Sequence, residues 1–220
     1  LLSEDQHFIV SIDGIGGLGK TALADYLARQ FIKSTRFDEI AWVTAKHTHL
    51  SMLGRLQIES GRPALTLPLL IEKLCTQFDL NPNSTSTHVQ RQRLLYQFMK
   101  DRRCLVIIDN LETVADYRSL IPEIRQWQNP AKFLLTSRIR LISEPGVFSY
   151  SHKELEKEPA LELIRQEAGR GGFTDLATAV DKDVQKIYEV VGGNPLALKL
   201  IIGQLRFYSL ATVLSRFTSK

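Results

Sequence analysis

The sequence has few cysteines and no long apolar run, which argues against a disulfide-stabilised protein and against a membrane-spanning one. Its 220 residues contain two cysteines, Cys75 and Cys104, each inside an apolar run, which favours buried free thiols in a reducing compartment over a disulfide. No stretch approaches the roughly 20 apolar residues of a membrane span. The acidic start at residues 1–5 is unlike a signal peptide, and the missing initiator Met suggests a fragment of a longer chain. We therefore expect a cytoplasmic protein that does not enter a membrane.

The net charge of the chain is small as well. Lys and Arg total 28 against 24 Asp and Glu, which gives a net charge of +4, and the basic residues are scattered among the acids. No basic tract is interleaved with aromatic residues, so we expect no direct binding to nucleic acid. The 44% hydrophobic content is typical of a soluble globular protein, and the length suffices for one large domain or for a medium and a small one.

Short apolar runs alternate with helical patterns over the first two thirds of the chain. The runs typical of strands are 7–13, 38–45, 104–109, 132–137 and 146–150. Helical spacing of apolar residues appears at 20–33, 67–78, 89–100 and 112–127. The polar segments 46–62 and 81–87 are predicted to be loops. This alternation predicts an α/β fold built on a parallel sheet.

The pattern becomes purely helical after residue 152. Candidate helices are 159–168, 177–191, 195–206 and 209–218. We therefore predict two domains, an α/β domain over 1–152 and a small all-helical subdomain over 153–220.

The segment from Gly14 to Thr21, GIGGLGKT, fits the P-loop pattern G-x-x-x-x-G-K-[ST] and lies between a predicted strand and a predicted helix. Glycines let the backbone turn its N–H groups inward around a phosphate, and the helix start adds its positive dipole end. Lys20 would contact the β- and γ-phosphates, and Thr21 would ligate Mg²⁺. The predicted nucleotide-binding residues of this segment are Gly14, Gly16, Gly17, Leu18, Gly19, Lys20, Thr21 and Ala22.

Asp109 closes a wholly apolar strand, where P-loop enzymes place an acid that holds Mg²⁺, usually through water. The alternative is an Asp that caps a turn or a helix. Asn110 follows at the position where many hydrolytic P-loop proteins have a second acid, and an amide cannot act as a general base. Glu112 either replaces that acid or is an acidic residue of a first helical turn. We predict slow or very weak hydrolysis.

Arg138 follows a predicted strand end and would reach a γ-phosphate on the same sheet edge, although spacing alone gives more weight to a surface arginine beside Arg140. The segment 192–198, GGNPLAL, contains a glycine helix stop, an Asn cap and a Pro at the first helical position, which explains it without a ligand. His47, His49 and Cys75 match no common zinc spacing, so no metal site is predicted there.

Together these motifs resemble the NB-ARC domain of the STAND class of P-loop NTPases, which occurs in apoptosome scaffolds, plant disease-resistance proteins and bacterial regulators. The matching segments follow the family's order, at 14–24, 37–45, 104–112, 132–138 and 192–200. The resemblance implies that Arg138 is the sensor of the terminal phosphate and that Pro195 packs beside adenine. It also implies that the strand before Arg138 lies between the P-loop strand and the Asp109 strand.

The resemblance further implies an ATP/ADP-binding molecular switch that uses Mg²⁺. Exchange of ADP for ATP and slow hydrolysis would control conformation and self-assembly, with Lys20, Asp109, Asn110 and Arg138 at the reacting phosphates. The implied partners are an adenine nucleotide, held between the two domains, and the effector and sensor domains of the full-length chain. Two other functions stay open, namely a continuously cycling ATPase and a nucleotide-regulated transcription regulator whose DNA-binding part lies elsewhere.

Overall fold

In the computed structural model, the described residues (7–45, 65–80, 86–111 and 114–218) form two compact units. The first unit contains a single parallel sheet and extends to Ser151, except that Ile15–Gly19 group with His152–Lys220 in the second unit. The strands are β1 (Ile9–Asp13), β2 (Glu39–Thr44), β3 (Cys104–Leu111), β4 (Lys132–Ser137) and β5 (Val147–Ser151).

The strands of the sheet follow the order β2-β3-β4-β1-β5, and every neighbouring pair is parallel. β4 therefore lies between the P-loop strand β1 and the Asp109 strand β3, which confirms the strand order implied by the resemblance. Because all strands are parallel, the residues after β1, β3 and β4 meet at one edge of the sheet.

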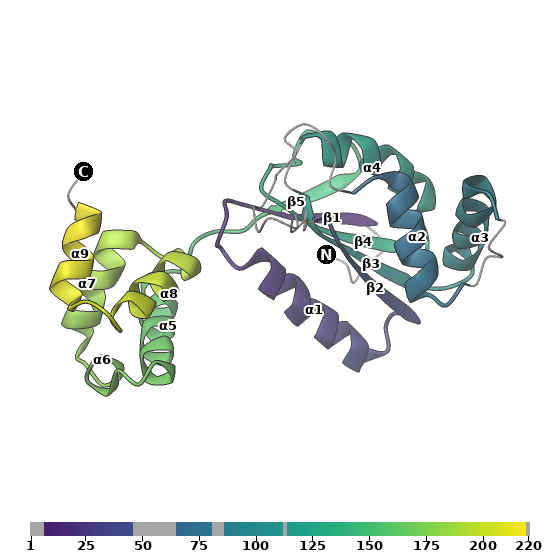
Figure 1. Ribbon diagram of the computed structural model, residues 1–220. Helices are drawn as coiled ribbons and strands as arrows, with labels where there is room; N and C mark the ends of the chain where they lie inside the picture. Colours follow the sequence, from purple (N-terminus) through teal and green to yellow (C-terminus); the bar gives the residue numbers. More distant parts are fainter. Residues whose placement is uncertain (1–6, 46–64, 81–85, 112–113, 219–220) are drawn as a thin grey trace, which may run out of the picture. The chain divides into compact units, whose positions relative to one another are not determined.

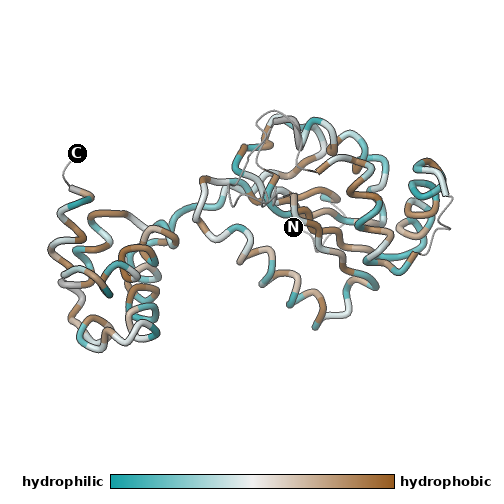
Figure 2. Tube along the Cα trace, viewed as in Figure 1, coloured by the Kyte–Doolittle hydropathy of each residue, from teal (hydrophilic) through white to brown (hydrophobic). Residues whose placement is uncertain are grey.

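Helices cover both faces of the sheet. α1 (Lys20–Ser34) lies on one face, and α2 (Leu67–Gln77), α3 (His88–Lys100) and α4 (Val114–Trp127) lie on the other (Figure 1). Val10 and Ile12 of β1 pack in the α1 core, whereas Ile9 packs in the core beneath α2 to α4. The strands accordingly form the hydrophobic centre of this unit in Figure 2. The predicted α/β fold is confirmed, and its strand and helix bounds differ from the predicted ones by a residue or two.

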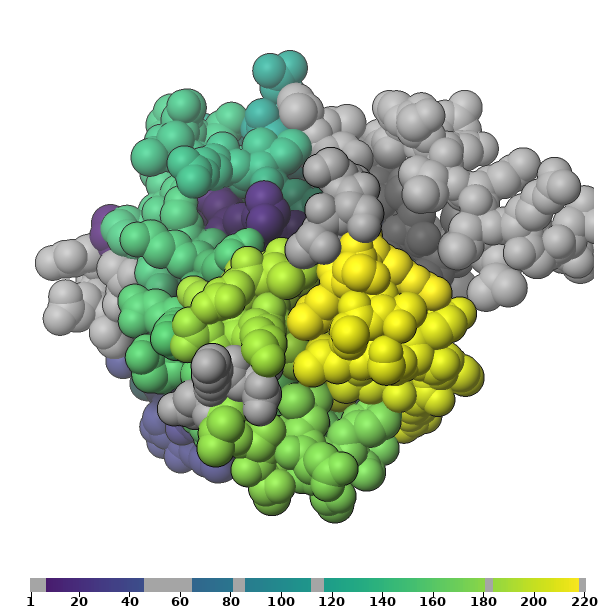
Figure 3. Space-filling model, turned by 90° about the vertical axis from the view of Figure 1, so that its left-hand side faces the viewer, coloured from purple at the N-terminus to yellow at the C-terminus, as the bar shows by residue number. Residues whose placement is uncertain are grey.

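In its described part after residue 152, the second unit contains helices and no strand. Its helices are α5 (Lys157–Arg170), α6 (Thr174–Ala177), α7 (Asp181–Val191), α8 (Pro195–Gln204) and α9 (Leu210–Thr218). α5 packs against α6, α7 and α8, and α9, in yellow in Figure 3, packs against α7. Val184 and Ile187 of α7 are fully buried, one helical turn apart.

The prediction of one helix over 177–191 is wrong. α6 ends at Ala177, and the Thr178 hydroxyl donates to the carbonyl of Thr174 (2.9 Å). Val180 then adopts an extended conformation before α7. A hydroxyl that bonds its own helix's backbone competes with continued helix, and the apolar spacing alone did not reveal that break.

The two cysteines are free and buried, as predicted. Burial raises the pKa of the Cys104 thiol to about 12 and also raises that of Cys75, so both remain protonated at neutral pH. None of the helices in the described ranges is both long and apolar enough to cross a membrane. The predicted loop at 46–62 and residues 81–85 of the second predicted loop lie outside the described residues.

Gln77 at the end of α2 covers the exposed edge of β2. Its side-chain amide accepts from the backbone N–H of Trp42 and donates to the carbonyl of the same residue, both at 2.7 Å. An unpaired strand edge is a template for pairing with another chain, and one side chain here satisfies a donor and an acceptor of that edge.

We expect Gln77→Ala to lower the free energy of unfolding by about 1 kcal/mol, because water replaces two hydrogen bonds at an exposed edge. Urea denaturation followed by tryptophan fluorescence measures this, since both tryptophans, Trp42 and Trp127, belong to the first unit. Glu72→Ala, at an exposed position of the same helix, is the control. Equal urea midpoints for the two variants would contradict the edge-covering role.

Candidate nucleotide site

The carboxylate of Asp109 joins three elements at the carboxyl edge of the sheet. It ends the apolar part of β3 and is almost completely buried. Its Oδ1 accepts from the hydroxyl of Thr21 in the first turn of α1 (2.8 Å) and from the hydroxyl of Thr136 in β4 (2.6 Å). The two sequence-predicted magnesium ligands, Thr21 and Asp109, are thus brought together.

Hard oxygen donors are what Mg²⁺ prefers, so this donor set fits the ion that the family implies. The other side chains considered as metal ligands are histidines and a cysteine, which are typical zinc ligands. Across the residues that the structure describes, no group of three or more His, Cys, Asp and Glu side chains could hold a metal ion. His47 and His49 lie outside that part of the chain.

Thr136 is a site residue that sequence analysis missed. It is buried, and its hydroxyl oxygen accepts from the backbone N–H of Asn110 (2.8 Å) while its proton goes to Asp109. Asn110 has φ of +73°, and the register between β3 and β4 shifts there. Asn enters the left-handed region more readily than most residues do, so Asn110 suits the bulge that Thr136 closes.

The P-loop begins directly after β1. The N–H of Gly14 donates to the carbonyl of Ser137 (3.2 Å), which ties the start of the loop to the end of β4. Lys20 returns to the same glycine, and its ammonium donates to the Gly14 carbonyl at 2.6 Å. Gly19 has φ of +93°, and a Cβ there would meet no atom within 4 Å. This glycine is therefore required by backbone conformation and not by crowding.

The first turn of α1 contains no acidic residue. A helix start of this kind offers backbone N–H groups and positive dipole charge to an anion, with no side-chain carboxylate competing for them. Together with the position of the Lys20 ammonium, this arrangement fits a bound phosphate.

The middle of the loop groups with the second unit. The Asn194 side-chain amide donates to the carbonyl of Gly16, and the N–H of Leu196 donates to the carbonyl of Gly17, both at 3.2 Å. Gly17 has φ of +83°, and a Cβ there would lie 2.8 Å from both Asn194 and Leu196. Glycine is therefore required at this position both by the backbone conformation and by the lack of space for a side chain.

The segment at 192–198 folds as its local pattern predicts. Gly192 ends α7 with φ of +70°, Asn194 caps α8 through the N–H groups of Leu196 and Ala197, and Pro195 is the first helical residue. The position of Pro195 beside adenine stays a prediction.

Arg138 is exposed immediately after β4, as is Arg140. Its predicted contact with the terminal phosphate also stays a prediction. Glu112, the candidate replacement for the second acid, lies outside the described residues.

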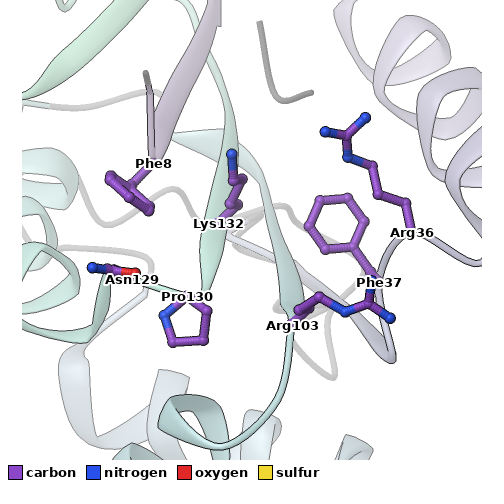
Figure 4. A pocket seen from close by; sticks show the side chains of 7 residues that line it. All are labelled: Phe8, Arg36, Phe37, Arg103, Asn129, Pro130 and Lys132. Carbon is purple, nitrogen blue, oxygen red and sulfur yellow. The ribbon is translucent and has the colours of Figure 1, made fainter. Parts of the chain in front are cut away.

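A pocket of about 580 Å³ lies at the opposite, amino edge of the sheet (Figure 4). Its lining residues precede or begin strands or lie in the turn before β4: Phe8, Arg36, Phe37, Arg103, Asn129, Pro130 and Lys132. Arg103 forms an exposed ion pair with Asp38 (2.5 Å). The hydrogen bonds that Arg103 donates lower the pKa of the Asp38 carboxyl to about 2. Because nucleotides bind at the carboxyl ends of parallel strands, this pocket is not the nucleotide site.

We expect Thr136→Val to lower the free energy of unfolding by about 1 to 3 kcal/mol, since the variant keeps the shape but leaves the Asn110 N–H without its acceptor and Asp109 without one of its two hydroxyl donors. Thr136→Ser keeps the hydroxyl and should recover most of that loss. Urea denaturation of the three proteins measures the difference. Equal stability of the Val and Ser variants would contradict the bridging role of the hydroxyl.

Comparisons with known proteins agree with this geometry. The disease resistance protein RPP8 of Arabidopsis thaliana is 28% identical over 222 residues, which covers 93% of this chain but only 22% of that protein's length. Two solved structures share the fold at 12% identity. AMPPCP-bound DnaA from Aquifex aeolicus has a TM-score of 0.52 and covers 98% of this chain and 61% of its own. Cdc6p from Pyrobaculum aerophilum has a TM-score of 0.54 and covers 94% and 56%.

The family model described as the NB-ARC domain matches residues 1–173, most of the chain. The observed sheet and helices are those of a P-loop NTPase fold. The chain belongs to the NB-ARC family and is a nucleotide-binding module of that family.

Proposed function

We propose that this chain is the ATP/ADP-binding switch module of a larger signalling protein of the STAND class. The observation that carries the proposal is the 2.8 Å hydrogen bond from Thr21 to Asp109, which brings the P-loop helix and the strand-end acid to one point. Such a pair is suited to holding a magnesium nucleotide. Mg²⁺, when bound, would neutralise phosphate charge between these two side chains.

In this proposal, the phosphates lie on the loop and first helical turn, at 14–22. The Lys20 ammonium, which now donates to the Gly14 carbonyl, would donate to the β- and γ-phosphates. Arg138 would contact the terminal phosphate, and Pro195 would pack beside adenine. We infer two domains, 1–152 and 153–220.

A switch requires that a ligand bind one conformation more tightly than another, because a ligand shifts an equilibrium only by that difference. The γ-phosphate distinguishes ATP from ADP, and Arg138 is our candidate for the contact that responds to it. The resulting change would control self-assembly and the effector and sensor domains elsewhere in the full-length protein. A cytoplasmic location is part of the proposal, which the two buried free thiols support.

The proposal predicts that the purified chain retains an adenine nucleotide. We expect close to one ADP or ATP per chain after denaturation, identified by chromatography and mass spectrometry, and none in Lys20→Ala, which loses the phosphate-binding ammonium. Lys33→Ala, an exposed position in the last turn of α1, is the matched control and should retain the nucleotide. A guanine nucleotide, or an empty wild type with no thermal shift in Mg-ATP, would refute the assignment.

We also predict slow hydrolysis, because Asn110 offers an amide where a carboxylate would accept a proton from water. Single-turnover decay of bound ATP should proceed at roughly 10⁻³ s⁻¹ or slower, as in unassisted P-loop switches. Asn110→Asp, which tolerates the same backbone conformation, should accelerate the decay, whereas Asn110→Ala should not. Rapid multiple turnover by the wild type would instead favour a continuously cycling ATPase.

A further inference from the structure

Asp13 is a buried carboxylate that the predicted nucleotide site does not use. It is the last residue of β1, directly before Gly14, and is completely buried. It accepts hydrogen bonds from the hydroxyls of Ser11 and Ser149 and from the backbone N–H of Leu141 (3.0 Å). In the described part of the chain, its partners are these neutral donors and no cation.

The bond to Leu141 fixes the far end of the segment that carries Arg138. The side chain of Leu141 is buried in the core beneath α2 to α4, and its N–H is held by Asp13. At the near end, the hydroxyl of Ser137 donates to the carbonyl of Leu111 (2.8 Å) and accepts from the N–H of Ile139 (3.0 Å). Arg138 is thus exposed on a short segment whose backbone is anchored on both sides.

Asp13 also adjoins the start of the P-loop. Asp13 is bonded covalently to Gly14, whose N–H donates to the carbonyl of Ser137 (3.2 Å). Through Ser149, the carboxylate also reaches the edge strand β5. One buried group therefore joins the first residue of the phosphate loop, the Arg138 segment and β5.

Burying a carboxylate is costly unless its oxygens are hydrogen-bonded, and an apolar residue would fill this position without that cost. A carboxylate is useful here because it accepts from several donors at once. The hydroxyls of Ser11 and Ser149 can rotate toward other acceptors, but the N–H of Leu141 cannot. The bond that depends most on Asp13 is therefore the one that holds the Arg138 segment.

We propose that Asp13 is a positioning residue for terminal-phosphate recognition, which it serves by holding the Arg138 segment at a fixed place relative to the start of the P-loop. The inference rests on the proposed function, in which Arg138 contacts the γ-phosphate. A long arginine side chain binds more tightly when its backbone is already held in place, because less freedom is lost on binding. Asp13 should consequently affect the affinity for ATP and leave that for ADP nearly unchanged.

The test is calorimetric titration of the whole chain, freed of nucleotide, with Mg-ATP and with Mg-ADP. We expect Arg138→Ala to weaken ATP binding about tenfold, the loss of one charge-assisted hydrogen bond, with ADP binding nearly unchanged. Asp13→Ala should reproduce that selective loss. Arg138→Ala combined with Asp13→Ala should lose no more than either alone, because both changes remove the same contact.

Two matched variants separate positioning from general weakening of the fold. Ser149→Ala removes a hydrogen bond to the same carboxylate but leaves Leu141 held, so the ratio of ATP to ADP affinity should stay at the wild-type value. Asp13→Asn keeps an oxygen that can accept from Leu141 and should restore most of the ATP affinity lost in Asp13→Ala. A folded Asp13→Ala protein with an unchanged ratio, or losses that add in the double variant, would overturn the inference.

The outcomes distinguish this inference from the function on which it rests. If Arg138→Ala binds ATP as well as the wild type does, the sensor assignment fails first. If Arg138→Ala loses ATP affinity and Asp13→Ala does not, only the inference fails. Should Asp13→Ala not fold, hydrogen exchange of the wild type decides, because the Leu141 amide must be strongly protected. Exchange of that amide at the rate of an unstructured peptide would refute the anchoring.

Discussion

The hydrogen bonds of the Asp109 carboxylate hold the site together. Asp109 lies at the end of a strand that is covered on both faces, and it reaches Thr21 of α1 and Thr136 of β4. The bond to Thr136 depends on β4 being the neighbour of β3, and the pairing of β4 with β1 places Ser137 against Gly14. Without that order, Asp109 and the segment after β4 would not be neighbours at the shared edge of the sheet. The geometry proposed for phosphate and Mg²⁺ therefore depends on strand order as much as on the loop itself.

The buried carboxylates of Asp13 and Asp109 at this edge accept hydrogen bonds from the same kinds of donor. Hydroxyl groups of Ser and Thr, together with one backbone N–H, supply their donors. Neutral donors satisfy the oxygens without cancelling the negative charge, whereas a lysine or arginine partner would neutralise it. At Asp109, this charge is what an ion such as Mg²⁺ requires. Asp13 is completely buried, and its bond to the Leu141 N–H holds the backbone of the segment after β4.

Asn110 bears on both the backbone conformation and the proposed chemistry of the site. Its left-handed backbone forms the bulge in β3, and its N–H is held by Thr136. An aspartate would tolerate the same conformation, so the amide is not required by the backbone. In the proposed function, an amide in place of an acid removes a general base, which would favour holding the nucleotide over turning it over.

Most of the strands and helices and the P-loop pattern were predictable from the residues alone, because strand and helix periods, the glycines before Lys20 and the cap before Pro195 are local features. One failure was local, because the break before α7 involves a hydroxyl that bonds back four residues to Thr174. The others were non-local, because the roles of Thr136, Asp13 and Gln77 depend on residues 26 to 136 positions away. The order of the strands came from family resemblance and not from periodicity. The donors of the buried carboxylates could not be read from the sequence, because such a group takes its hydrogen bonds from whichever chain segments the sheet places beside it.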